Sequence, residues 1–483
     1  MGKPRLAIAV SLFGVLVGCG DGSVPDGATD GSTSSGDSPT TIEPTVTATV
    51  STTATTGTTS ADGSSSSDDD DTGTGIGTDL GGLPTDGCVV FDAFSADLAS
   101  AEPRAREGLA TTFIAEMHDS EHGLPIRCDG RLVVLAWDEP GTALSVTGDF
   151  AQWDPQAHPL APLVPDVSLL VADIVVEEPL APSTYKIVRG GTEYVADPFA
   201  RRYGWDEFGE YSLTDARPDA SHHERYPGFS AGARDLSPRQ IVVYVPAGAF
   251  DGGRDLGVLY MHDGQNLFSP DAFFGGWQVT AAMDDAIATG DIAPMFVVGI
   301  DNTSDRFDEY TQTTDDIGSG PVGGRADEYA DFLALGIKPF VDDRYPTAPD
   351  AASTAVLGSS LGGLVSLYIG WRHPDVFGYA GSMSGTLGWG SMGKANDRIL
   401  ELFEHQPPSD LWIYLDSGGD GSCPGGSDNY CANVEMRDAL DDLGWSLAET
   451  LVYVHAPGAS HDEAAWASRF PGVLDALGTA MGR

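Results

Sequence analysis

Residues 354–367 read TAVLGSSLGGLVSL, and this stretch decides the fold. It starts as a short, mostly apolar strand, continues through a Gly-x-Ser-x-Gly turn and ends in an apolar segment suited to a helix. The glycines at 358 and 362 allow the close backbone approach that a strained strand-to-helix turn requires, with Ser360 at its tip. The N–H groups and positive dipole end of the following helix would face negative charge that forms beside Ser360 Oγ. The pattern predicts a nucleophilic serine.

A serine nucleophile needs a histidine base, and with this kind of turn the chain order is serine, acid, histidine. The histidines after Ser360 are His373, His405, His455 and His461. The first two come too early for a strand and an acid loop to intervene, and His455 ends an apolar run typical of a strand. His461 lies in a loop between the last predicted strand and the last predicted helix. We therefore predict that His461 is the base.

The acid should follow the preceding strand, which residues 411–415 predict. The candidates after it are Asp416, Asp420 and Asp428. Asp416 is nearest the strand end and suits a role in capping the loop. Asp428 stands at an N-cap position of the next helix. Asp420 is therefore the favoured acid, while Asp416 and Asp428 remain open.

Two backbone donors should stabilise the oxyanion of an acyl-transfer reaction. The N–H of Leu361, next to the nucleophile, is the first. Residues 258–261 predict an early strand that runs into a polar loop, and in this loop Gln265 N–H is the expected second donor, with Gly264 N–H as the alternative. We also expect Asp263 and Trp389 to contact substrate.

The same segments carry a family resemblance. Residues 238–480 resemble the Putative esterase family, which includes esterase D, feruloyl esterases, enterochelin esterases and mycobacterial mycolyltransferases. The similar segments, in order, are the loop 260–266, the elbow 358–363, the helix end 372–377, the acid loop 415–420 and the histidine loop 458–461. In this family the acid falls two to three residues past the loop glycine, which implies Asp420. The chain departs from the family by placing residues 421–429 and two cysteines after that position.

Strand and helix patterns divide the chain into two folded parts. Over residues 216–483 predicted strands alternate with helices, which predicts a mostly parallel sheet with flanking helices. The resemblance implies that this α/β unit has the α/β-hydrolase fold. Residues 87–215 combine a helical segment with short strands separated by turns, which predicts a small β-sandwich. Parts of this unit, beginning at residues 148–154, resemble an isoamylase-type early-set domain.

The N-terminus predicts where the protein acts. Residues 1–19 have basic residues, an apolar core too short to span a membrane, and then Leu-Val-Gly-Cys, which resembles a bacterial lipobox. Residues 1–19 are therefore predicted to be a lipoprotein signal peptide with Cys19 as the lipidation site, so the membrane contact would be a lipid anchor alone. Residues 20–86 are almost only Gly, Ser, Thr, Asp and Pro, without Lys or Arg, which predicts a disordered tether. We expect the protein to be anchored at the extracytoplasmic face of a bacterial envelope membrane.

The chain has five cysteines, and assigning Cys19 to the lipid leaves an even number. These suit an oxidising compartment. The favoured local pairing joins Cys88 to Cys128 and Cys423 to Cys431. No Cys-x-x-Cys or His-Glu-x-x-His spacing indicates a metal site, and we expect neither metal nor cofactor.

The formal net charge is −47, which argues against nucleic acid, anionic lipid surfaces and polyanionic substrates as partners. The sequence thus predicts a surface-anchored serine hydrolase that cleaves carboxylic esters, with acetyl or feruloyl groups on carbohydrates favoured. A siderophore esterase and an acyltransferase of the same family are the alternatives. A glycan-binding lipoprotein without catalysis is the competing class, and the oligomeric state is left open.

Overall fold

The computed structural model describes residues 86–482 apart from short gaps. The gaps are residues 122, 129, 140, 177–182, 215–216, 232–234, 254, 319, 409 and 425. The predicted signal peptide, the lipidation site Cys19 and the tether up to residue 85 lie outside the described residues. No helix in the described part of the chain is long and apolar enough to cross a bilayer.

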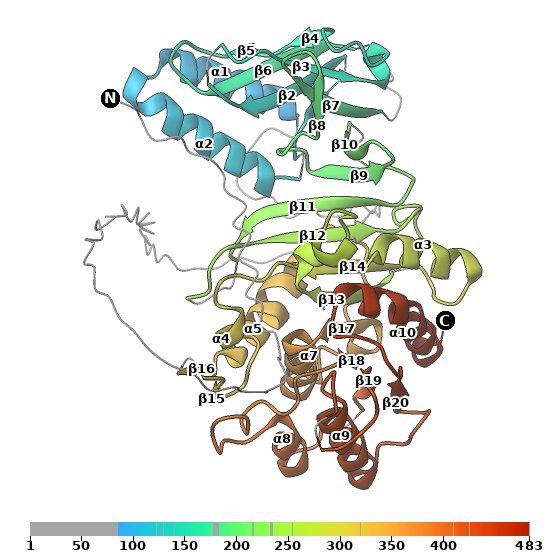
Figure 1. The fold of residues 1–483 in the computed structure, drawn as a ribbon. Coiled ribbons are helices and arrows are strands. Elements are labelled where there is room, and N and C mark those ends of the chain that lie inside the picture. Colours follow the sequence, from blue (N-terminus) through green and yellow to red (C-terminus); the bar gives the residue numbers. More distant parts are fainter. Residues whose placement is uncertain are drawn as a thin grey trace, which may run out of the picture. The chain divides into compact units, whose positions relative to one another are not determined.

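The first folded part is a β-sandwich with two helices packed against one of its sheets (Figure 1). The helices are α1 (Gly87–Ser100) and α2 (Pro103–Asp119). They cover a sheet with the strand order β1 (Ile126–Cys128), β2 (Arg131–Trp137), β6 (Leu169–Val175) and β5 (Ala161–Pro162). Because side chains alternate along a strand, Val133 and Leu135 of β2 face the helices, whereas Leu132 and Val134 face the second sheet.

The second sheet of the sandwich continues into the α/β unit. Its outer strands are β4 (His158–Pro159), β3 (Leu144–Gly148), β7 (Thr184–Arg189) and β8 (Glu193–Val195). The strands that follow are β10 (Gly209–Leu213), β9 (Arg202–Asp206), β11 (His222–Phe229) and β12 (Arg239–Val245). All of these belong to one 14-stranded sheet of the described residues, so the hydrogen-bond ladder crosses the boundary expected near residue 215.

The α/β unit has a parallel sheet at its centre, as predicted. From the far edge the strand order is β20 (Leu451–His455), β19 (Trp412–Ser417), β18 (Tyr379–Met383), β17 (Thr354–Ser359), β13 (Gly257–His262) and β14 (Met295–Ile300). These strands run parallel to one another, and β12 joins β14 in the antiparallel sense. Every residue of β14 and β17 is buried, as expected for strands covered on both faces.

Helices cover both faces of this sheet (Figure 1). On one face lie α3 (Val279–Thr289) and α10 (Glu463–Met481). The other face carries α5 (Ala326–Phe332), α6 (Lys338–Arg344), α7 (Leu361–Arg372), α8 (Ile399–His405) and α9 (Tyr430–Leu443). A short helix, α4 (Arg306–Glu309), and a hairpin of β15 (Thr314–Asp316) and β16 (Pro321–Gly323) follow β14. This arrangement is the α/β-hydrolase fold predicted from the sequence.

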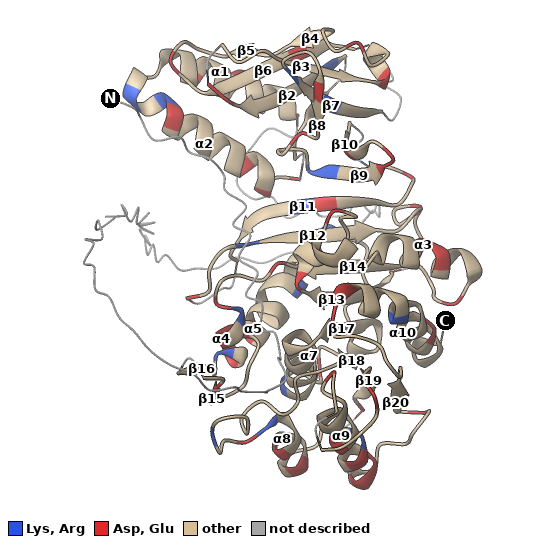
Figure 2. Ribbon diagram, viewed as in Figure 1, with Lys and Arg blue, Asp and Glu red and all other residues tan. Residues whose placement is uncertain are grey.

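Two disulfides join the predicted cysteine pairs. Cys88 at the start of α1 is bonded to Cys128 at the end of β1, and Cys423 is bonded to Cys431 in the first turn of α9. The predicted pairing is therefore confirmed. Acidic residues are conspicuous on α8 and α9, whereas Lys and Arg are sparse throughout the described ribbon (Figure 2). The described part of the chain is thus acidic as well, in keeping with the sequence charge.

Candidate active site

Ser360 occupies the predicted turn between β17 and α7, at the carboxyl edge of the parallel sheet. Its backbone has φ 54° and ψ −121°, a strained conformation for a residue with a side chain. Such strain costs about 1–3 kcal/mol and is tolerated where the surroundings fix it. A Cβ at Gly358 would lie 2.6 Å from the carbonyl carbon of Gly362, so the turn requires glycine at position 358. The elbow therefore has the geometry that the motif predicts.

Hydrogen bonds tie Ser360 to the last residue of β18 and to the segment that follows this strand. Its N–H donates to the Met383 carbonyl at 3.0 Å, and its own carbonyl accepts the Thr386 N–H at 3.0 Å. The two hydroxyls are also paired, with Ser360 Oγ 3.2 Å from Thr386 Oγ1. Within the described residues, Ser360 Oγ is hydrogen-bonded to this threonine and not to His461. Catalytic hydrogen bonds are often long or unformed before substrate binds, so this contact describes the resting site.

His461 lies in the loop between β20 and α10 and is paired with Asp428. Its Nδ1 is 2.6 Å from Asp428 Oδ1, which is a short hydrogen bond. The Asp428 side chain is 1% exposed, whereas that of His461 is 37% exposed. The carboxylate is therefore buried, and its histidine partner is open to solvent. The ring of Trp466 stands edge-on to the imidazole, with centroids 5.0 Å apart.

The contact with His461 corrects the preference for Asp420. The Asp420 side chain is exposed, and its Oδ1 accepts the Ser422 N–H at 3.1 Å. The hydrogen bonds from Ser422 lower the pKa of this carboxyl. Asp416, the other alternative, is buried in an ion pair with Arg469 at 3.1 Å. Neither carboxylate is placed to orient the imidazole.

The path of the chain after β19 explains this difference. Gly419 N–H donates to the Ala459 carbonyl at 3.0 Å, and Gly458 N–H donates to the Gly419 carbonyl at 2.7 Å. These bonds fasten the start of the acid loop to the histidine loop. The Cys423–Cys431 disulfide then holds the loop against the first turn of α9, and Asp428 within this loop faces the imidazole. The N-cap position of α9 belongs to Asn429, which leaves the Asp428 carboxylate available to His461.

The predicted oxyanion loop packs directly against the elbow. After β13, Asp263 adopts φ 58° and starts a short 3-10 helix, η2 (Gly264–Asn266). A Cβ on Gly362 would be 3.4 Å from both Asp263 Oδ2 and His262 Cβ, so the two segments touch. Leu361 begins α7 and Gln265 lies in η2. The structure therefore brings together the segments that hold the two predicted donors.

The geometry does not favour the predicted substrate contacts of Asp263 and Trp389. Asp263 Oδ1 and Oδ2 accept Arg306 Nε and Nη2 at 2.7 and 2.8 Å, and Asn302 Nδ2 donates to Oδ1 at 2.6 Å. Burial raises the pKa of Asp263, but Arg306 and Asn302 outweigh it and the net pKa is lowered. Trp389 is 1% exposed, and its indole N–H donates to the Thr313 carbonyl at 2.8 Å. Both side chains are used to hold neighbouring loops.

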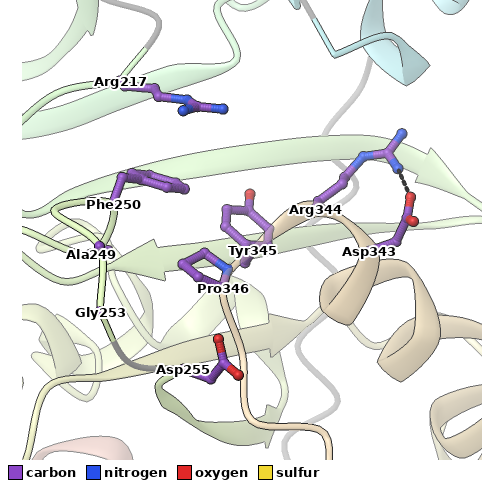
Figure 3. Close-up of a pocket in the computed structure, with 10 residues that line it drawn as sticks. Arg217, Ala249, Phe250, Gly253, Asp255, Asp343, Arg344, Tyr345 and Pro346 are labelled. Carbon is purple, nitrogen blue, oxygen red and sulfur yellow. Dashed lines mark ion pairs between the residues drawn. The ribbon is translucent and has the colours of Figure 1, made fainter. Parts of the chain in front are cut away.

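A cavity of about 540 Å³ lies elsewhere in the α/β unit (Figure 3). Phe250, Asp255 and Tyr345 are among the residues that line it. Asp255 comes just before β13, so the cavity is at the amino ends of the parallel strands. Ser360 follows the carboxyl end of β17, which pairs in parallel with β13. The cavity and the serine are therefore at opposite ends of the parallel strands.

The parallel sheet, the serine elbow after β17 and the histidine loop before α10 define a hydrolase of the α/β class. Comparison with known families places the chain more narrowly. The family described as Putative esterase matches residues 236–477, half of the 483-residue chain, and the chain belongs to this family.

Individual relatives match shorter stretches. The chain is 30% identical over 153 residues to an iron(III) salmochelin esterase of Escherichia coli O6:H1, and 33% identical over 104 residues to an endo-1,4-beta-xylanase/feruloyl esterase of Xylanibacter ruminicola. The first match covers 31% of this chain and 33% of the relative's length. The second covers 21% of this chain and 13% of the relative's length. An alignment with the solved structure of the enterobactin esterase of Shigella flexneri covers 72% of this chain and 93% of the esterase chain, at 16% sequence identity and a TM-score of 0.41.

Proposed function

We propose that this protein is a serine esterase that cleaves carboxylic esters with Ser360, His461 and Asp428. Ser360 Oγ attacks the acyl carbon, while His461 takes its proton and later delivers it to the leaving alcohol. Asp428 holds the imidazole through Nδ1 and stabilises the imidazolium that forms. The observation that carries the proposal is the 2.6 Å contact between His461 and a buried carboxylate, on loops at the same sheet edge as the elbow.

The oxyanion of the tetrahedral intermediate would be stabilised by the N–H groups of Leu361 and Gln265. Support comes from the contact between the η2 loop and the elbow and from the position of Leu361 at the start of α7. His262 beneath this loop is buried, and burial lowers its pKa to about 3. A neutral imidazole there leaves the oxyanion region without an added histidine charge.

We favour acetyl or feruloyl esters of carbohydrates as substrates. Similarity to a xylanase/feruloyl esterase supports this class, and the acidic chain suits an uncharged glycan better than an anionic ligand. Similarity to the salmochelin esterase supports siderophore esters as the second candidate. Rates on acetylated xylan oligomers, feruloylated oligosaccharides and a catecholate trilactone distinguish the two. Turnover of the trilactone alone would contradict the carbohydrate proposal.

The location proposed from the sequence is a lipid anchor at Cys19. Expression of the full chain in a bacterial host should give a membrane-bound protein that incorporates labelled fatty acid. The Cys19→Ser variant should lose both the label and membrane retention, because the acyl chains supply the membrane affinity. Equal labelling of the two proteins would show that Cys19 is not the acylated residue.

The Cys423–Cys431 disulfide should support catalysis as well as stability. Asp428 lies inside the loop that it closes, so its loss should let the carboxylate move away from His461. Displacement by about 1 Å can cost on the order of 100-fold in rate. The Cys423→Ser/Cys431→Ser variant should lose turnover at temperatures where it is still folded. Cys88→Ser/Cys128→Ser removes the other bridge as a control, and an equal loss of turnover there would contradict a local effect.

A further inference from the structure

The second carboxylate oxygen of Asp428 faces a hydroxyl whose direction is fixed by its neighbours. Ser384, just after β18, has its Oγ 2.6 Å from Asp428 Oδ2. The same Oγ lies 2.8 Å from Arg469 Nη2 and 3.1 Å from Trp466 Nε1, both from α10. A hydroxyl has one hydrogen and two lone pairs, and these two nitrogens only donate. Both lone pairs are therefore filled, so the hydrogen must point to Asp428.

Arg469 is itself held in a single orientation. Its Nε and Nη2 lie 3.1 Å from Asp416 Oδ2 and Oδ1, and Asp416 is fully buried. Asp416 Oδ1 also accepts the N–H of Ser384 at 3.1 Å. Arg469 Nη2 is 4.0 Å from Asp428 Oδ2 and adds positive charge beside it. Asp416 thus fixes both the guanidinium and the serine backbone.

These contacts leave one oxygen of Asp428 for the histidine. Oδ2 accepts the hydroxyl of Ser384 and the N–H of Gly418, whereas Oδ1 meets His461 Nδ1. A rotation of the carboxylate would break all three bonds. The backbone of Ser384 adopts φ 50°, an unusual conformation for serine that the surrounding bonds must hold.

We propose that Ser384 is a positioning residue of the esterase, and that Arg469 and Trp466 act through it by directing its hydrogen to Asp428. This inference rests on the proposed function, because the purpose of the fixed carboxylate is to orient the catalytic imidazole. Asp416, one of the two alternatives to Asp420 in the sequence prediction, has the separate task of holding Arg469.

Ser384→Ala tests the inference, with Ser382→Ala as a matched control. Ser382 lies two residues earlier on β18 and is also fully buried, but its Oγ has no hydrogen-bond partner among the described residues. On p-nitrophenyl acetate, Ser384→Ala should lower kcat by about 10- to 100-fold, with KM changed less than about threefold. Ser382→Ala should keep kcat within about threefold of wild type. Equal losses in the two variants, or a wild-type kcat for Ser384→Ala, would overturn the inference.

A double-mutant cycle separates positioning from general damage. In an Asp428→Asn background Ser384→Ala should change the rate by less than about twofold, because its effect passes through the carboxylate. Labelling of Ser360 by a fluorophosphonate gives a second rate for the same four proteins. A full loss in both backgrounds would mean that Ser384 acts by another route, which contradicts the proposal.

Two further variants keep the test decisive. If Ser384→Ala does not fold, Trp466→Phe frees one lone pair of Ser384, and kcat should fall by about three- to tenfold at unchanged KM. A wild-type kcat in Trp466→Phe would overturn the inference. Ser360→Ala examines the proposed function separately. Activity that survives Ser360→Ala contradicts the esterase mechanism, whereas loss there with wild-type kcat in Ser384→Ala contradicts only the role of Ser384.

Discussion

Replacement of Ser360 by alanine should abolish ester hydrolysis, with turnover lower by about 10⁴- to 10⁶-fold. The reason is that Ser360 carries the hydroxyl at the tip of the elbow, beside the N–H groups at the start of α7, and without it the acyl-enzyme cannot form. Turnover of p-nitrophenyl acetate by the purified variant, together with circular dichroism to confirm folding, provides the measurement.

Ser359→Ala is a close control for this variant. Ser359 is the preceding residue, but it is 4% exposed and belongs to β17. Its replacement should leave turnover within about threefold of wild type, since it removes only a small buried hydroxyl. More than about a tenth of wild-type activity in Ser360→Ala would show that the nucleophile lies elsewhere.

The second large effect is expected at Asp428. Asp428→Asn keeps the shape of the side chain but removes the charge that orients and stabilises the imidazolium, so turnover should fall by about 10³- to 10⁴-fold. Asp420→Asn is the matched control, because the Asp420 carboxylate is exposed and accepts the N–H of the nearby Ser422. It should stay within about threefold of wild type.

Asp416→Asn distinguishes structural from catalytic effects. It breaks a buried ion pair with Arg469, a change that typically costs about 3–5 kcal/mol in stability. Its main consequence should be a lower melting temperature. A greater loss of turnover in Asp420→Asn than in Asp428→Asn, each measured below its melting temperature, would return the acid role to Asp420.

The parts of the fold and site that the sequence predicts are those that local patterns determine. The elbow at Ser360 needs only its glycines, an apolar strand before it and a helix after it. His461 follows from chain order and from its loop between the last strand and helix. The central strands are continuous apolar runs because helices bury both faces of the sheet.

The acid could not be predicted in the same way. Asp420 and Asp428 are both in the loop after β19, and hydrogen bonds between Gly419 and the histidine loop decide which one faces His461. Such contacts between distant residues leave no local periodicity. The burial of Trp389 is beyond local prediction for a related reason, because it depends on the segment before β15, where the Thr313 carbonyl accepts the indole N–H.

Ser384 and Thr386 had no motif to mark them. A weaker signal was present, because they follow β18, the parallel neighbour of the strand that ends at the elbow. Residues after the carboxyl ends of adjacent parallel strands meet at one edge of the sheet, where ligand sites form. The position of Ser384 and Thr386 after such a strand end is the signal that marks them as site candidates.

The ladder between β9 and β11 has a consequence for how the two folded parts depend on each other. Arg202 and Tyr203 of β9 pair with Glu224 and His223 of β11, so the sandwich occupies the edge at which the esterase sheet would otherwise end. An uncovered edge strand offers unpaired N–H and C=O groups to other chains and promotes aggregation. The N-terminal unit therefore covers the edge strand through which the esterase sheet could otherwise pair with another chain.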